Sequence, residues 1–273
     1  STHGRFPTNG WGFAWTGESD RGSSRRQPAG WIYCILPFIE ESPVHDMGAG
    51  LLGSPRQAAL LARLARPLKG FNCPSRRSGL FPYIQAWSFV NAGRPSQVTR
   101  SDYAANGGDA YISPATPEQP RWSSAPPNTD AGPVNLSEGE SDRAHATFRA
   151  KEFAATGVFF VGSQTTVQKI PDGLSKTLLL GEKYLNPDRY YDGQDSADNE
   201  AALIGCNQDI TRWTASRPLN DTPGFADGTR FGGPHLGVLG LALCDGAIRF
   251  TDVNVDERLF RSLGHRADGE ASV

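Results

Sequence analysis

His235 opens the stretch HLGVLGLALCDGAIRF, in which nine residues separate the imidazole from the pair Asp245-Gly246. Histidine and aspartate are residue types used in acid–base catalysis and in metal binding. The residues between them alternate along the chain with the period of a β-strand, and Asp-Gly is a strong signal for a hairpin turn. We therefore expect Asp245 and Gly246 to form the turn and His235 to connect a loop to the sheet. Their expected roles are structural in the first place, and catalytic only in the second.

The densest group of carboxylates is the acidic run DGQDSADNE at 192–200. Calcium takes six to eight oxygen ligands, so this run could supply a Ca²⁺ site, and calcium is the cofactor that the sequence suggests. The candidate ligands are Asp192, Asp195, Asp198 and Glu200. Because the run lacks the twelve-residue spacing of an EF-hand, an acidic surface loop is the competing interpretation.

A carboxylate-based hydrolase is a second alternative, since two carboxyl groups placed across a bond can cleave it. The fold would have to bring together side chains that are far apart in sequence; the candidates are Asp102, Asp109, Glu182 and Asp209. No G-x-S-x-G, H-E-x-x-H or phosphate-binding loop motif occurs. These absences favour a protein that is not an enzyme.

Aromatic and sulfur-containing side chains leave two further alternatives open. Exposed tryptophans could stack on the sugars of a cell-surface glycan, although tryptophan is more often a core residue; the candidates are Trp11, Trp15, Trp122 and Trp213. The four cysteines form no C-x-x-C pair, and in an exported protein they allow one or two disulfides. Buried free thiols are the competing interpretation.

The composition is that of a globular protein rich in strands, turns and loops. The chain has 273 residues, of which 38% are hydrophobic, with 31 glycines and 20 prolines. The net charge of −2 and the absence of a basic stripe argue against a nucleic-acid partner. The short basic stretches RGSSRR (21–26) and PSRRS (74–78) are interpreted as solvated loops.

The elements that position these residues follow from periodicity and turn signals. We expect a buried helix over 30–42, a helix over 54–68, strands over 157–170 and 177–181, and a terminal helix over 255–264. Asp172-Gly173 is interpreted as a turn, 102–112 as a structured loop and 113–145 as a long loop insertion. The order of helices followed by strands predicts one α+β domain over 1–273.

Several motifs in this order resemble a large family of prepilin-like proteins abundant in planctomycetes. The family is a domain of unknown function (DUF1559, similar to type II secretion pseudopilins) that carries a C-terminal H-X9-DG signature. The matching stretches are GWIYCILPFIEE, FNCPSRR with Cys73 and Pro74, SDYAANGGD with Asp102, Tyr103 and Asn106, IPDGLSKTLLLGEKYL with Glu182, and FGGPH before the signature. The resemblance covers about residues 5–265. Departures are Cys34, where a polar residue is usual, and Leu-Ser-Lys-Thr at 174–177.

The resemblance implies a pilin-like head, with helices packed on an antiparallel sheet and long loop insertions. A leader and a long hydrophobic helix would precede this chain, and the membrane would be reached only through that helix. The implied location is extracytoplasmic, in the periplasm or at the cell surface. The implied role is a non-enzymatic subunit for assembly, secretion or adhesion, with other pilin-like subunits or secretion machinery as partners. The motif residues are then determinants of the fold.

Overall fold

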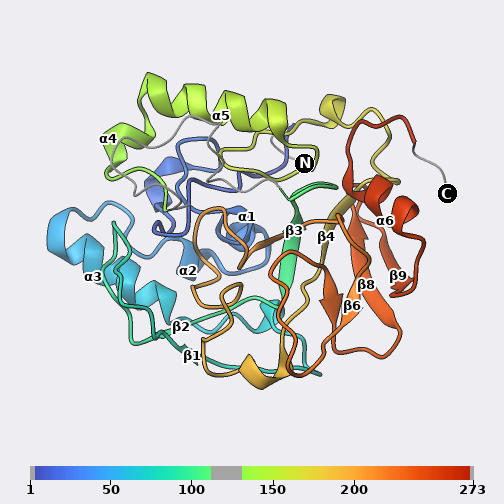
Figure 1. The fold of residues 1–273 in the computed structure, drawn as a ribbon. Helices are drawn as coiled ribbons and strands as arrows, with labels where there is room; N and C mark the ends of the chain where they lie inside the picture. The colour runs from blue at the N-terminus through green and yellow to red at the C-terminus, as the bar shows by residue number, and fades with distance from the viewer. Residues whose placement is uncertain (1–3, 112–130, 271–273) are drawn as a thin grey trace.

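A computed structural model describes residues 4–111 and 131–270 and has an α+β fold (Figure 1). The helices are α1 (Trp31–Ile35), α2 (Ser42–His45), α3 (Gly53–Leu64), α4 (Leu136–Gly139), α5 (Asp142–Ala154) and α6 (Glu257–Gly264). The strands are β1 (Phe81–Pro82), β2 (Gln97–Val98), β3 (Tyr103–Asn106), β4 (Leu178–Glu182), β5 (Thr211–Arg212), β6 (Leu219–Asn220), β7 (Gly232–Gly233), β8 (Val238–Leu243) and β9 (Ile248–Asp252). In the described part of the chain, no helix has the length and apolarity needed to cross a bilayer.

The central sheet has five strands in the order β5-β3-β4-β8-β9. Neighbouring strands are antiparallel from β3 to β9, whereas β5 runs parallel to β3. The predicted α+β class is therefore confirmed, with a mixed rather than wholly antiparallel sheet. Two small sheets, β1–β2 and β6–β7, flank it.

The predicted hairpin is present as β8 and β9. Gly246 has φ of 91°, and the Asp245 carboxylate accepts a hydrogen bond of 2.9 Å from the Ala247 N–H. A positive φ favours glycine because it has no Cβ, and the short aspartate side chain closes the turn. The local chemistry of these two residues is sufficient to explain the turn.

Replacing Gly246 with valine should lower the free energy of unfolding by about 1–2 kcal/mol, because a β-branched residue is strained at positive φ. No side chain or backbone atom lies close to the position where the new Cβ would be, so the effect would report backbone strain alone. Thermal unfolding measures it. Gly70→Val, also at an uncrowded position but without a positive φ, is the matched control. An unchanged melting temperature for Gly246→Val would contradict the turn conformation.

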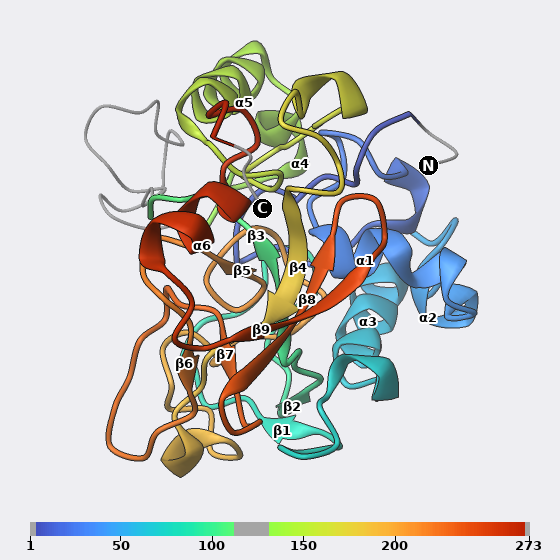
Figure 2. The ribbon, with the colours of Figure 1, turned by 90° about the vertical axis from the view of Figure 1, so that its right-hand side faces the viewer.

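The two faces of the sheet have different neighbours. Leu239 and Leu241 of β8 pack with Phe231 and with Phe260 of α6. The opposite face is covered in part by α1 (Figure 2), and on it small residues of β8 lie beside apolar residues of β9. The register places Ile248 opposite Ala242 and Phe250 opposite Gly240. Along β8, period-two alternation thus gives one buried face and one face that is only partly covered.

The predicted helices form, with shorter bounds. The segment 30–42 contains α1, followed by a 3₁₀ turn (Leu36–Phe38) that includes Pro37. Helix α3 begins at Gly53, and Leu60 and Leu64 are fully buried on its inner face. Helix α6 matches the predicted terminal helix, and its N-cap Asp256 accepts a hydrogen bond from the Leu259 N–H.

Two of the predicted elements are wrong. The segment 157–170 is not a strand: Val158–Val161 is buried without strand pairing, and the Phe159 N–H donates to the Asn106 carbonyl at 3.0 Å. The predicted loop at 102–112 contains strand β3, because β4 on one side and β5 on the other satisfy its backbone groups. An apolar run therefore stays irregular where it forms no ladder with a strand, and a polar segment becomes a strand where it pairs on both sides.

The predicted insertion at 113–145 divides in two. Residues 113–130 lie outside the described residues. The remainder contains α4 and the start of α5, which were predicted as loop. The side chains of Asn135 and Ser141 cap these helices by accepting hydrogen bonds from Glu138 and Ala144 N–H groups. The capping residues that suggested a loop therefore start helices here.

Candidate functional site

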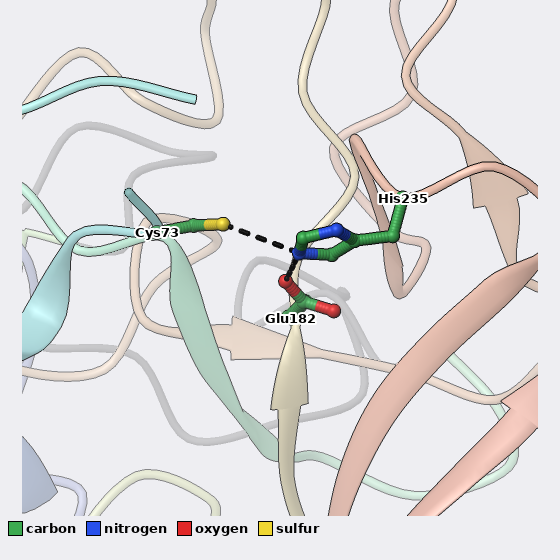
Figure 3. Close-up of side chains that lie close together, drawn as sticks. All are labelled: Cys73, Glu182 and His235. Atoms are coloured by element: carbon green, nitrogen blue, oxygen red, sulfur yellow. Dashed lines mark hydrogen bonds and ion pairs between the residues drawn. The ribbon is translucent and has the colours of Figure 1, made fainter. Parts of the chain in front are cut away.

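Cys73, Glu182 and His235 lie together at one point of the structure (Figure 3). The Cys73 Sγ is 3.4 Å from the His235 Nε2, and the Glu182 Oε1 is 3.4 Å from the same nitrogen. The thiol and the carboxylate are buried, whereas 42% of the imidazole side chain is exposed. The group thus combines a soft sulfur donor, a borderline nitrogen donor and a hard oxygen donor at the edge of the core.

Separate elements hold the three side chains in place. Glu182 ends β4, and its Oε2 accepts a hydrogen bond of 3.0 Å from the Gly240 N–H of β8. The Cys73 N–H donates to the Asp102 carboxylate at 2.8 Å. Asn220 fixes the loop of His235, since its Nδ2 donates to the His235 carbonyl at 2.5 Å. Each of the three residues is therefore held by a hydrogen bond to a residue outside the group.

A cavity of about 620 Å³ adjoins this group on the partly covered face of the sheet. Its walls come from α1 and the turn after it, from the segment 68–71, and from β4, β8 and β9. The lining is mainly apolar: Trp31, Ile35, Ile39, Leu68, Gly70, Phe71, Leu180, Gly181, Gly240, Leu241, Ala242, Ile248 and Phe250, together with Glu41, Tyr103, Glu182 and His235. We call this cavity the sheet groove. Cys73, only 2% exposed, is not part of its lining.

Burial controls the charge state of the thiol. Removal from water raises the pKa of Cys73, and the nearby Glu182 carboxylate acts in the same direction. Burial likewise raises the pKa of the Tyr103 hydroxyl. Without a cation at this point the thiol therefore stays protonated at neutral pH, which is unfavourable for a cysteine nucleophile.

The residues predicted as solvated basic loops include a buried ion-pair network. The side chains of Arg76 and Arg77 are fully buried. The Nε of Arg77 is 2.7 Å from the Asp102 Oδ1, and its Nη2 is 2.8 Å from the Asp198 Oδ1. The Lys183 Nζ lies 2.8 Å from the same Asp198 oxygen. The interpretation of 74–78 as a solvated loop was wrong, because acidic partners from other segments compensate both guanidinium groups.

The four candidate calcium ligands are engaged by different protein groups. Asp198 lies in the buried network, where Arg77 and Lys183 hold its pKa well below the usual range against the opposing effect of burial. Asp192 pairs with Arg189, and Asp195 accepts a hydrogen bond from the Ala197 N–H. Among the described residues these carboxylates do not form one group of candidate metal ligands. Calcium binding at 192–200 stays a prediction.

Glu200 faces Asp209 instead. The Asn207 Nδ2 donates to the Glu200 Oε2 at 2.9 Å and to the Asp209 Oδ2 at 2.8 Å. Burial, and then the charge of Asp209, raise the pKa of Glu200 well above its usual value. A single amide thus holds two buried carboxyl groups side by side.

Replacing Glu200 with glutamine should flatten the dependence of stability on pH. The raised folded-state pKa stabilises the wild type below the unfolded pKa of about 4.3, and this contribution is lost as the pH rises through the folded pKa. Glutamine does not titrate, so the variant should lack this loss. Melting temperatures measured from about pH 4 upward test the difference. Glu270→Gln, at an exposed ion pair, should leave the profile almost unchanged; parallel curves for Glu200→Gln and wild type would contradict the prediction.

The other residues of the family motifs have structural contacts. The Asn106 Nδ2 donates to the carbonyls of Leu178 and Gly264 at 2.8 and 2.9 Å, which joins β3 to β4 and α6. Gly173 has φ of 104°, and the Asp172 carboxylate accepts from two backbone N–H groups of the C-terminal segment. Pro74 is exposed next to Cys73. Asn106, Asp172 and Gly173 thus have contacts or a backbone conformation within the fold, and the structural role of the motif residues stays a prediction.

The remaining candidates are separated or buried. Asp109 accepts a hydrogen bond from Thr156, so the hydrolase candidates have different partners: Asp102 pairs with arginine, Asp209 with Asn207, and Glu182 faces His235. The indoles of Trp11, Trp15 and Trp213 are buried, which removes them as exposed stacking surfaces, and Trp122 lies outside the described residues. All four cysteines are buried and none of them is in a disulfide, so the disulfide alternative is not realised.

A second group of possible metal ligands joins Asp172, His265 and Asp268 near the C-terminus. It is more exposed, and its acceptor atoms already have partners. The His265 Nδ1 accepts from the Ala267 N–H at 2.9 Å, and the Asp268 carboxylate accepts from the Glu270 N–H at 2.8 Å. These contacts describe a stabilised turn rather than a set of converging donors.

Sequence reasoning named Cys73, Glu182 and His235 one by one as motif residues and did not connect them. The signal was available: three chemistry-bearing residues occur in three different stretches of the family resemblance, FNCPSRR, IPDGLSKTLLLGEKYL and FGGPH. Cys73 and His235 are 162 positions apart in the sequence, which prevented any local pattern from showing the convergence.

The comparisons with known proteins agree with the resemblance. Neither the curated proteins nor the solved structures include a significant match to this chain. A family described as a protein of unknown function (DUF1559) matches residues 1–258. Since this match spans nearly the whole sequence, the chain belongs to the DUF1559 family.

Proposed function

We propose that this protein is the non-enzymatic, extracytoplasmic head of a pilin-like subunit, and that the sheet groove docks an apolar helix of a pilin-like subunit. One observation carries the proposal: the face of β8 and β9 is apolar and only partly covered. Ile248 is 65% exposed and Phe250 is 78% exposed, although both line the groove. Large apolar side chains gathered on one exposed surface are typical of an interaction site.

The shape of the groove favours a helix as the occupant. A sheet face that is not solvated is normally covered by a helix or a second sheet, and α1 covers only part of this one. Gly240 and Ala242 are small residues and therefore leave space above β8, while Phe250 and Ile39 add large apolar side chains to the lining. An apolar helix can place side chains one turn apart into such a groove. The family resemblance, which implies a long hydrophobic helix in pilin-like subunits, supplies that partner.

The experiment is photo-cross-linking in the native cells, with p-benzoylphenylalanine in place of Phe250. The expected result is a cross-link whose peptide maps to the apolar N-terminal helix of a pilin-like protein. Phe153 on α5, which is 96% exposed and outside the groove, is the matched control position and should give no such product. No cross-link at 250, or cross-links only to other molecules, would overturn the proposal.

A further inference from the structure

We propose that Cys73, Glu182 and His235 form a binding site for one divalent transition-metal ion of the zinc type. The Cys73 Sγ, the Glu182 Oε1 and the His235 Nε2 converge on one point, with all three atoms within 4.8 Å of one another. Nothing in the proposed docking function requires this site, so the two proposals stand independently.

Two of the three separations between the donor atoms fit tetrahedral coordination. Zinc binds sulfur at about 2.3 Å and nitrogen or oxygen at about 2.0–2.1 Å, so tetrahedral angles place the ligand atoms about 3.3–3.6 Å apart. The Sγ–Nε2 and Nε2–Oε1 distances are both 3.4 Å. The third pair, Sγ and Oε1, lies within 4.8 Å, so an adjustment of either side chain would complete the tetrahedral arrangement.

The donor set selects the class of metal. A thiolate and an imidazole suit zinc and related transition ions, whereas calcium and magnesium prefer an all-oxygen set. With the thiol deprotonated, Cys73 and Glu182 carry two negative charges, which a divalent cation neutralises inside a buried site. Metal binding would release the proton that burial otherwise keeps on Cys73.

The arrangement differs from that of a nucleophilic triad. In a triad the acid orients the histidine through one ring nitrogen while the other nitrogen faces the nucleophile. Here the thiol and the carboxylate both approach Nε2, and Nδ1 points away from them (Figure 3). The carboxylate therefore does not orient the ring through Nδ1 as in a triad, whereas three donor atoms gathered at one point are the arrangement of metal ligands.

The supporting contacts are those expected around a metal site. The Gly240 N–H holds the Glu182 Oε2 and leaves Oε1 directed at the histidine. The Cys73 N–H is held by Asp102, which is itself fixed by Arg77. Partners of this kind orient the ligands of a metal and increase its affinity.

The fourth coordination position would face the sheet groove. Glu182 and His235 line the groove, whereas Cys73 lies behind them. Three protein ligands with one open position are characteristic of zinc sites that exchange a water or bind a further ligand. A water, or a carboxylate carried by a molecule in the groove, is the ligand class that fits.

The test is metal titration of the purified chain after treatment with a chelator. We expect one Zn²⁺ per chain and a higher melting temperature, since a ligand that binds only the native state stabilises it. Co²⁺ in place of Zn²⁺ should give the intense visible bands of tetrahedral cobalt and a near-ultraviolet thiolate-to-cobalt band. His235→Ala should weaken binding by more than about 100-fold, because supporting residues alone contribute about 10- to 100-fold.

Matched variants separate this site from the alternatives. Cys73→Ser should abolish the thiolate band, whereas Cys244→Ser, at another buried thiol, should retain it. His265→Ala, in the second group near the C-terminus, should bind metal as the wild type does. If Cys73→Ser fails to fold, the metal titration of His235→Ala still provides the test, because the His235 side chain is 42% exposed. No binding, binding without a thiolate band, or loss of binding in His265→Ala alone would overturn the proposal.

Discussion

Replacing Asp198 with alanine is expected to lower the free energy of unfolding by about 3–5 kcal/mol, because removal of one partner leaves buried charges uncompensated. Asp198 is paired with Arg77 and with Lys183, and all three side chains are almost completely buried. Arg77 keeps Asp102 as a partner, but Asp198 is the only carboxylate that forms an ion pair with Lys183 among the described residues. Thermal or urea unfolding measures the loss.

The control is Asp192→Ala, which lies six residues earlier in the sequence and is paired with Arg189 at the surface. Exposed ion pairs contribute little to stability, so this variant should unfold close to the wild type. Equal effects of the two substitutions would show that burial of the network does not determine its contribution.

The same network predicts the response to acid. Its cations hold the pKa of Asp198 well below the usual range, so the stabilisation is present above the unfolded pKa of about 3.9 and is lost as the pH falls through the folded pKa. Asp198→Ala should therefore lose less stability than the wild type between about pH 4 and pH 2. Unfolding curves at several acidic pH values give the comparison.

Trp31→Ala is the second substitution with a large expected effect, about 3–5 kcal/mol of unfolding free energy. Trp31 is buried at the start of α1, packs edge-on against Phe71 and lines the sheet groove. Its Nε1–H donates to the Ile210 carbonyl at 3.0 Å. The substitution therefore opens a void and removes one of the two hydrogen bonds that the Ile210 carbonyl accepts, the other being donated by the Ala105 N–H.

Two further variants separate the contribution of the buried aromatic volume from that of the Nε1–H hydrogen bond. Trp31→Phe keeps most of the aromatic volume and removes the N–H donor, so it should cost less than Trp31→Ala. Trp87→Ala removes an exposed indole and should cost less still. A loss under about 1 kcal/mol for Trp31→Ala would contradict its role as a core residue between α1 and the segment of Phe71.

Local sequence chemistry determined the elements that have their own start and stop signals. Asp245-Gly246 set the β8–β9 hairpin through a positive φ, and the apolar spacing after Ser54-Pro55 set α3. The α+β class and the family followed from the order of such elements and motifs. These features depend on residues close together in the chain, and a single sequence carries that information.

Tertiary structure decided the features that depend on distant partners. Val158–Val161 carries a strand-like apolar run but forms no ladder with a strand, whereas the polar segment of β3 pairs with two strands. Arg77 and Asp198, interpreted as a solvated cation and a calcium ligand, are counterions for each other. In both cases the sequence specified the chemical type of a group, and the fold specified the group opposite it.

The candidate site shows the same division. Sequence alone identified Cys73, Glu182 and His235 as notable residues in three motifs. Only the pairing of β4 with β8 and the loop held by Asn220 bring their donor atoms within reach of one another. The physical reason is that donor distances of a few ångströms depend on contacts between segments far apart in the chain, which no local periodicity or turn preference encodes.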